Sequence, residues 1–157
     1  MYSIVLIDDE KGIVDGLQLL IQRGLPNCEI VGRAYDGHEG LQVCLAKKPD
    51  IVITDIRMFQ MDGLEMIQQL LTHKFQGKFI ILSAYSEFSY AQKGIQLGVK
   101  FYINKPVEEE ELYECVRHVI SEIEDERQRI RKIAGLMEKV QHKTDHLKTF
   151  VFRNILE

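Results

Sequence analysis

The chain has 157 residues, enough for one compact domain with a hydrophobic core and a further short segment. The net charge of −4 does not indicate a chain that binds nucleic acid over its whole surface. The 45% of hydrophobic residues is typical of a globular protein. No apolar run approaches the ~20 residues of a membrane helix, and the N-terminus lacks the layout of a signal peptide. The three cysteines, Cys28, Cys44 and Cys115, lie far apart, which favours reduced, packed thiols in a cytoplasmic protein over a metal site or disulfides.

Short apolar runs alternate with longer amphipathic segments along most of the chain. We expect strands over residues 3–7, 29–34, 51–54, 79–82 and 101–103. Apolar residues three and four positions apart predict a helix after each strand, around residues 13–21, 41–45, 64–71, 88–97 and 112–123. In the fourth helix we expect the core-facing residues to be Phe88, Ala91, Ile95 and Leu97, with Gly98 closing the helix.

Strands that are apolar on both faces and alternate with helices predict an α/β fold, in which a doubly wound parallel sheet is covered by helices on both sides. In such sheets ligands bind at the carboxyl ends of the strands, near a topological switch point. Polar side chains follow four of the five expected strands: Asp8 and Asp9, then Asp55, then Ser83, then Lys105. We therefore expect these side chains to converge on one edge of the sheet.

Three carboxylates in one place repel each other, so they persist with a bound cation or with raised pKa values. Hard oxygen donors without histidine or cysteine suit Mg²⁺. A lysine and a hydroxyl supply the charge and the hydrogen-bond donor that a phosphoryl group needs, and a carboxylate can itself attack phosphorus. The pattern therefore predicts a phosphoryl-acceptor site.

The segments LIDDE, ITDIRMFQMDG, ILSAY and FYINKP occur in this order, and over residues 2–123 the chain resembles receiver domains of bacterial two-component response regulators. The resemblance implies a flavodoxin-like, five-stranded parallel sheet of order 2-1-3-4-5 and a signalling switch in place of a conventional enzyme. It implies that a sensor histidine kinase phosphorylates Asp55 in a Mg²⁺-dependent reaction. The Mg²⁺ ligands it implies are Asp9 directly, Asp8 through water, Asp55 and the backbone carbonyl of Arg57.

By the same resemblance, Ser83 and Lys105 contact the phosphoryl group and Tyr102 is the aromatic residue that moves with Ser83. The Lys105–Pro106 bond is expected to be cis, a state that is accessible mainly before proline. One departure from the family pattern is Phe59, which stands where the loop after the aspartate usually carries proline. We expect it to change the stiffness of that loop and to leave the chemistry intact.

Beyond Ile123 the helical spacing continues through a thin apolar stripe: Ile130, Ile133, Met137, Val140, Thr144, Leu147 and Val151. A helix with so few apolar residues is marginal alone, so it needs a partner to stay ordered. We favour a parallel two-chain helical pair, although Arg127 interrupts the spacing. A helix that only spaces two domains is the alternative.

We therefore divide the chain into a receiver, 1–123, and a helical linker or dimerisation extension, 124–157, and expect the sequence to stop short of an output domain. The amino-acid sequence of residues 82–107 is similar to the corresponding segment of receivers that are joined to an AraC-type helix-turn-helix domain. We expect DNA contact only through that absent domain, no membrane contact, and a homodimer formed by the C-terminal helix or a receiver face. Two other classes of protein fit the sequence less well: a haloacid-dehalogenase-type phosphatase, whose DxD motif is missing here, and a standalone adaptor, for which the long tail has no evident use.

Overall fold

The computed structural model describes the backbone of residues 1–84 and 88–156, and the side chains of these residues except 88, 90, 91 and 144–156. Five strands alternate with five helices in chain order: β1 (Tyr2–Ile7), α1 (Lys11–Gly24), β2 (Cys28–Ala34), α2 (Gly37–Lys47), β3 (Ile51–Asp55), α3 (Gly63–Thr72), β4 (Lys78–Ser83), α4 (Phe88–Gln96), β5 (Phe101–Asn104) and α5 (Glu109–Leu156). Each expected strand is present and extends by one residue at one or both ends.

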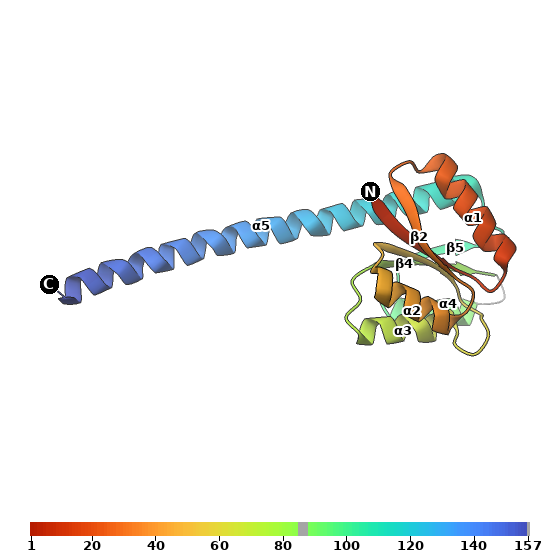
Figure 1. The fold of residues 1–157 in the computed structure, drawn as a ribbon, viewed down its shortest axis with the longest axis horizontal. Coiled ribbons are helices and arrows are strands. Elements are labelled where there is room, and N and C mark those ends of the chain that lie inside the picture. The colour runs from red at the N-terminus through yellow and green to blue at the C-terminus, as the bar shows by residue number, and fades with distance from the viewer. Residues whose placement is uncertain (85–87, 157) are drawn as a thin grey trace. The chain divides into compact units, whose positions relative to one another are not determined.

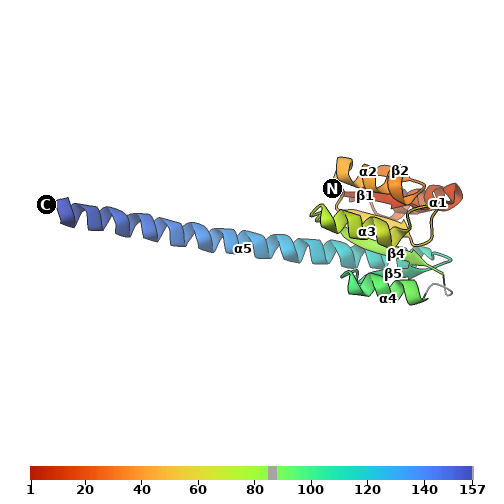
Figure 2. The ribbon, with the colours of Figure 1, turned by 90° about the horizontal axis from the view of Figure 1, so that it is seen from below.

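All strand pairs are parallel, and the sheet order is β2-β1-β3-β4-β5, which confirms the predicted fold class. Figure 2 shows β2 and β5 toward opposite edges of the sheet. The order reverses between β1 and β3, so the switch point of the sheet lies where these two neighbouring strands end. That position sets the site described below.

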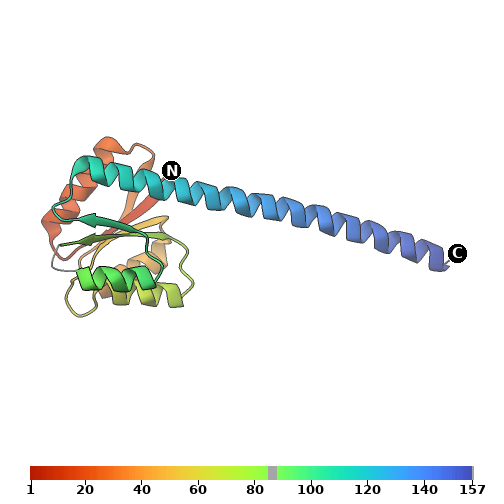
Figure 3. The same ribbon diagram turned by 180° about the vertical axis from the view of Figure 1, so that it is seen from behind.

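The sheet is apolar on both faces because helices cover both. Every residue of β3, from Ile51 to Asp55, is buried. Figures 1 and 3 show α1 and the beginning of α5 over one face, and α2, α3 and α4 over the other. On the latter face Val5, Val52 and Ile81 of the sheet pack with Met66 and Ile67 of α3.

Side-chain and backbone contacts fix the ends of the helices. Asp36 and Asp62 cap α2 and α3, each accepting a hydrogen bond of 2.8 Å from the backbone N–H three residues later. The hydroxyl of Tyr113, in the first turns of α5, donates to the carbonyl of Leu20 in α1 at 2.6 Å. The Lys105–Pro106 peptide is cis, as predicted.

The prediction that Ile95 faces the core is wrong, because this side chain is 62% exposed. Gly94 is buried in its place. A Cβ atom on Gly94 would lie 2.7 Å from the Tyr102 hydroxyl oxygen and 3.0 Å from Cδ1 of Ile81, so α4 lies too close to the sheet for a side chain there. Leu97 is half-buried as expected, whereas the side chains of Phe88 and Ala91 lie outside those described.

The cysteines are free thiols, as predicted; Cys28 and Cys44 are buried and Cys115 is only partly so. The chain divides into two compact units, Met1–Ile120 and Ser121–Glu157, and the second is built from the later turns of α5. Among the described residues of that unit, the large apolar side chains of Ile130, Ile133 and Met137 are exposed. No helix in the described part of the chain is long and apolar enough to cross a membrane.

Candidate functional site

Three carboxylates gather at the switch point of the sheet. Asp8 and Asp9 directly follow β1, and Asp55 is the last residue of β3, the strand that pairs with β1 in parallel. One carboxylate oxygen from each of the three lies within 4.8 Å of the others. Asp8 and Asp55 are buried, at 0% and 6% exposure, whereas Asp9 is exposed. The structure therefore brings together the acidic residues that the sequence placed at one edge.

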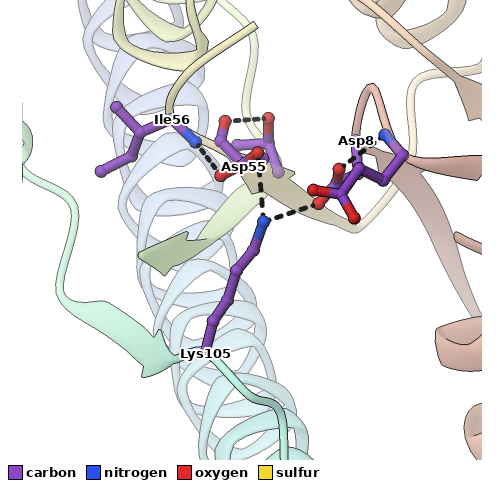
Figure 4. Close-up of polar contacts among 6 residues, drawn as sticks. Asp8, Asp55, Ile56 and Lys105 are labelled. Carbon is purple, nitrogen blue, oxygen red and sulfur yellow. Dashed lines mark hydrogen bonds and ion pairs between the residues drawn. The ribbon is translucent and has the colours of Figure 1, made fainter. Parts of the chain in front are cut away.

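Lys105 links the two buried carboxylates (Figure 4). Its Nζ atom lies 3.1 Å from Oδ2 of Asp8 and 3.1 Å from Oδ2 of Asp55. The backbone N–H of Lys105 donates to the carbonyl of Ser83 at 2.9 Å, which continues the pairing of β4 with β5. The hydrogen bonds of the sheet therefore place Lys105 near the end of β3, although it lies 50 positions after Asp55 in the sequence.

Backbone donors fix the orientation of both buried carboxylates. The N–H of Glu10 donates to Oδ1 of Asp8 at 2.9 Å, and the N–H of Ile56 donates to Oδ1 of Asp55 at 2.8 Å. Each aspartate therefore has one oxygen held by the backbone and the other by Lys105. These two N–H donors were not predicted. The direction in which a backbone N–H points after a strand cannot be inferred from the type of residue that carries it.

Gly63 is a second feature that the sequence reasoning did not single out. Its N–H donates to the carbonyl of Ile56 at 2.7 Å, and a Cβ atom there would lie 2.1 Å from the carbonyl oxygen of Asp55. The first turn of α3 therefore presses against the backbone of the central aspartate. The Asp62-Gly63 pair, a helix cap followed by glycine, was the available signal.

Burial makes the carboxylates poorer acids. Burial, and then the charge of Asp8, raises the pKa of Asp55 from 3.8 to about 6, although Lys105 and the Ile56 N–H act in the opposite direction. Burial also raises the pKa of Asp8. Burial alone would lower the pKa of Lys105, but the charges of Asp55 and Asp8 outweigh it and raise that pKa. The lysine therefore stays protonated between the two carboxylates.

The donor set fits a divalent cation of the hard kind. Three ionised carboxylates and one ammonium leave a net charge of about −2, which is the charge that a single Mg²⁺ neutralises. No histidine or cysteine belongs to the cluster found among the described residues, and oxygen-only sites favour Mg²⁺ over Zn²⁺. The residues present therefore fit the predicted metal.

The remaining predicted residues surround this cluster. Ser83 ends β4 beside the end of β3 and is buried, at 6% exposure. Arg57 follows β3 with an exposed side chain, and the ligand role of its backbone carbonyl stays a prediction. Tyr102 of β5 is half-buried against the core, and its hydroxyl donates to the carbonyl of Val99 at 3.1 Å. Phe59, in the loop that departs from the family pattern, is 76% exposed.

Sequence comparisons place the chain among known proteins. Residues 4–117 match the sequence model of the response regulator receiver domain. The chain is 36% identical over 157 residues to the uncharacterized transcriptional regulatory protein YesN of Bacillus subtilis, which covers 100% of this chain and 42% of that protein. It is 33% identical over 142 residues to the transcriptional regulatory protein HptR of Staphylococcus aureus, which covers 90% of this chain and 56% of that protein. The chain spans about half the length of these curated relatives.

Solved structures give the same comparison at the level of the fold. The REC domain of AraT, a response regulator from Geobacillus stearothermophilus, is similar with a TM-score of 0.74 and 34% identity, covering 80% of this chain and 98% of that chain. A two-component transcriptional regulator AraC from Clostridium phytofermentans has a TM-score of 0.68 and 27% identity, covering 77% and 94%. In both cases almost the whole of the matched chain superposes on part of this one.

Proposed function

The chain belongs to the response regulator receiver domain family, and we propose that it accepts a phosphoryl group on Asp55 from a sensor histidine kinase in a Mg²⁺-dependent reaction. The observation that carries the proposal is the position of Lys105, 3.1 Å from an oxygen of Asp55 at the centre of an acidic cluster. In this role the protein is a switch whose only chemistry is its own phosphorylation and dephosphorylation.

In the proposed reaction a carboxylate oxygen of Asp55 attacks phosphorus. The new P–O bond forms while the P–N bond to the kinase histidine breaks, and the histidine nitrogen keeps the electron pair. Lys105 already has a protonated amine beside this carboxylate, so it can offset negative charge on the phosphoryl oxygens in the transition state without reorganisation.

Asp8, Asp9, Asp55 and the backbone carbonyl of Arg57 would hold Mg²⁺ in this reaction. When bound, Mg²⁺ would supply further positive charge to the phosphoryl oxygens. Ser83, at the neighbouring strand end, would donate a hydrogen bond to the attached group, and Tyr102 would change position with it. Two observations support these roles: Ser83 is buried, and the Tyr102 hydroxyl lies so close to Gly94 of α4 that a Cβ atom there would be 2.7 Å from it.

The printed names of relatives support a transcriptional output. YesN and HptR are transcriptional regulatory proteins about twice as long as the region they share with this chain. We propose that residues 1–123 form the receiver and that 124–157 connect it to a DNA-binding output domain of the AraC type in a longer cytoplasmic protein. Phosphorylation would then change DNA binding through a homodimer.

A small phosphodonor tests the central claim without the kinase. Incubation with acetyl phosphate and Mg²⁺, followed by intact-mass analysis, should show one added phosphoryl group, and Asp55→Asn should abolish it. Asp50→Asn is a matched control, because Asp50 is an acidic residue directly before the first residue of the same strand, where it accepts hydrogen bonds from Ser3. Undiminished labelling of Asp55→Asn would place the nucleophile elsewhere.

A further inference from the structure

Thr54 is a buried polar residue in an apolar part of the sheet. It directly precedes Asp55 in β3, and its exposure is 0%. Its neighbours in the sheet are Ile7 of β1 and Ile81 of β4, which both belong to the hydrophobic core. The three preceding residues of β3 are isoleucine or valine. Valine has nearly the same shape as threonine and buries no hydroxyl group, so the hydroxyl at this position needs an explanation beyond packing.

The hydroxyl of Thr54 donates a hydrogen bond to one particular peptide group. Its Oγ1 atom lies 2.9 Å from the carbonyl oxygen of Asp55. The N–H of the same peptide group is that of Ile56, and it donates to Oδ1 of Asp55 at 2.8 Å (Figure 4). The peptide group between Asp55 and Ile56 therefore accepts a hydrogen bond from the threonine and donates one to the carboxylate.

Two hydrogen bonds on one peptide group strengthen each other. A donor at the carbonyl oxygen polarises the group and makes its N–H a stronger donor, and the effect is larger where water is excluded. Asp55 and Ile56 are only 6% and 1% exposed, so little water reaches either bond. The hydroxyl of Thr54 thus acts on the carboxylate of Asp55 through the peptide group between them.

The backbone of α3 also holds this peptide group. A Cβ atom on Gly63 would lie 2.1 Å from the carbonyl oxygen of Asp55, so the first residue of the helix is in close contact with that oxygen. The N–H of Gly63 donates to the carbonyl of Ile56, the next peptide group along the chain, at 2.7 Å. A hydroxyl and a helix backbone together fix the plane of the peptide group, and with it the direction of the N–H that holds Oδ1.

We propose that Thr54 is a positioning residue for the phosphorylation of Asp55: its hydroxyl orients and polarises the peptide group whose N–H holds Oδ1 of the nucleophile. The inference rests on the proposed function, since it concerns the reaction of that carboxylate. With Oδ1 held by the backbone, Oδ2 stays 3.1 Å from Nζ of Lys105. Loss of the hydroxyl lets the carboxylate turn more freely, and a reaction that depends on alignment slows when the reacting group is misplaced.

Three substitutions separate this role from a role in packing. Thr54→Ser keeps the hydroxyl and loses the methyl group, Thr54→Val keeps the size and loses the hydroxyl, and Thr54→Ala loses both. We expect the initial rate of labelling of the full chain by acetyl phosphate to stay within about twofold of the wild type for Thr54→Ser. For Thr54→Val and Thr54→Ala it should fall about three- to tenfold, the range that one net hydrogen bond spans. Rates are taken at saturating Mg²⁺, so a weaker metal site does not lower them.

Stability should follow a different order. Thr54→Ser and Thr54→Ala leave a cavity in the apolar layer, so both should unfold at lower urea concentration than Thr54→Val. The rate therefore follows the hydroxyl and the stability follows the size of the side chain. A residue that only packed would make Thr54→Ser slower than Thr54→Val.

The amide proton of Ile56 reports the hydrogen bond directly. Its NMR resonance should move upfield in Thr54→Val and Thr54→Ala, where the N–H is a weaker donor, and stay in place in Thr54→Ser. Thr72→Val is the matched control, because the Thr72 hydroxyl also donates to a backbone carbonyl, that of Gln68 at 3.0 Å, but at the end of α3 remote from Gly63. It should change neither the rate nor this resonance.

The role of Thr54 is overturned if Thr54→Val and Thr54→Ala label as fast as the wild type, or if Thr54→Ser is as slow as they are. Should Thr54→Val fail to fold, the comparison of Thr54→Ser with Thr54→Ala decides. Asp55→Asn distinguishes this failure from that of the proposed function. Labelling that persists in Asp55→Asn removes the proposed acceptor, whereas its loss there, with equal rates for all variants of Thr54, removes only the inference about the threonine.

Discussion

Replacement of the central aspartate should stabilise the metal-free protein. The pKa of Asp55 rises from 3.8 to about 6 on folding, so the folded protein disfavours its charged form. At 1.36 kcal/mol for each pKa unit, an ionised Asp55 lowers the free energy of unfolding by about 3 kcal/mol at pH 7.5. Asp55→Asn, which is neutral and similar in shape, should recover most of this, with the melting temperature rising by roughly 10 °C.

The pH dependence gives the expected sign. A carboxyl whose pKa is raised in the folded state contributes full stability below its unfolded pKa and loses it as the pH rises through the folded value. The advantage of Asp55→Asn should therefore grow between pH 4 and pH 6 and then level off; at pH 5 it should be about half of its value at pH 7.5. Urea unfolding in EDTA at the two pH values measures this directly.

Addition of Mg²⁺ gives a second test of the role of Asp55. Added Mg²⁺ should stabilise the wild type, because the three carboxylates that would bind it are brought together only in the folded chain, and should stabilise Asp55→Asn much less. If Asp55→Asn instead unfolds at lower urea concentration than the wild type at pH 7.5 without metal, then the hydrogen bond from Ile56 and the ion pair with Lys105 outweigh burial, and the reasoning from burial fails.

Three further outcomes are expected. Mg²⁺ affinity, measured by calorimetry, should fall as the pH drops below about 6, because protons compete for Asp55, and pH-independent affinity would exclude this carboxylate as a ligand. Gly63→Ala should lower the free energy of unfolding by about 1–3 kcal/mol in urea and slow labelling by acetyl phosphate, since its Cβ would meet the carbonyl oxygen of Asp55 at 2.1 Å. Gly94→Ala should lack the ~1 kcal/mol gain of an ordinary helical Gly→Ala change, because Tyr102 obstructs the new Cβ at 2.7 Å; Gly16→Ala, with nothing within 4 Å, should show that gain in the same assay.

The convergence of the site could be predicted because it follows from connectivity. Once the strands are parallel and alternate with helices, their carboxyl ends must meet at one edge, and the residue types there restrict the chemistry. For that reason, the pairing of Lys105 with Asp55 could be predicted although the two residues are far apart along the chain. The cis peptide after Lys105 was likewise accessible from the family resemblance.

Distances between elements could not be predicted in the same way. Helical periodicity assigned Ile95 to the core because it is large and apolar, but periodicity gives no measure of how closely a helix approaches its sheet. Around Gly94 the space is filled from the sheet side, by Tyr102 and Ile81. The two backbone donors on Asp8 and Asp55 are similar cases, since any residue type supplies an N–H group.

The two sides of the site differ in how many neighbouring strands hold them in place. Asp8 and Asp55 adjoin β1 and β3, interior strands that each hydrogen-bond to a neighbour on both sides. Lys105 follows β5, a strand of only four residues that is held along one edge. We therefore expect any rearrangement that a new charge among the aspartates causes to occur on the lysine side, where Tyr102 of the same strand lies close to Gly94 of α4.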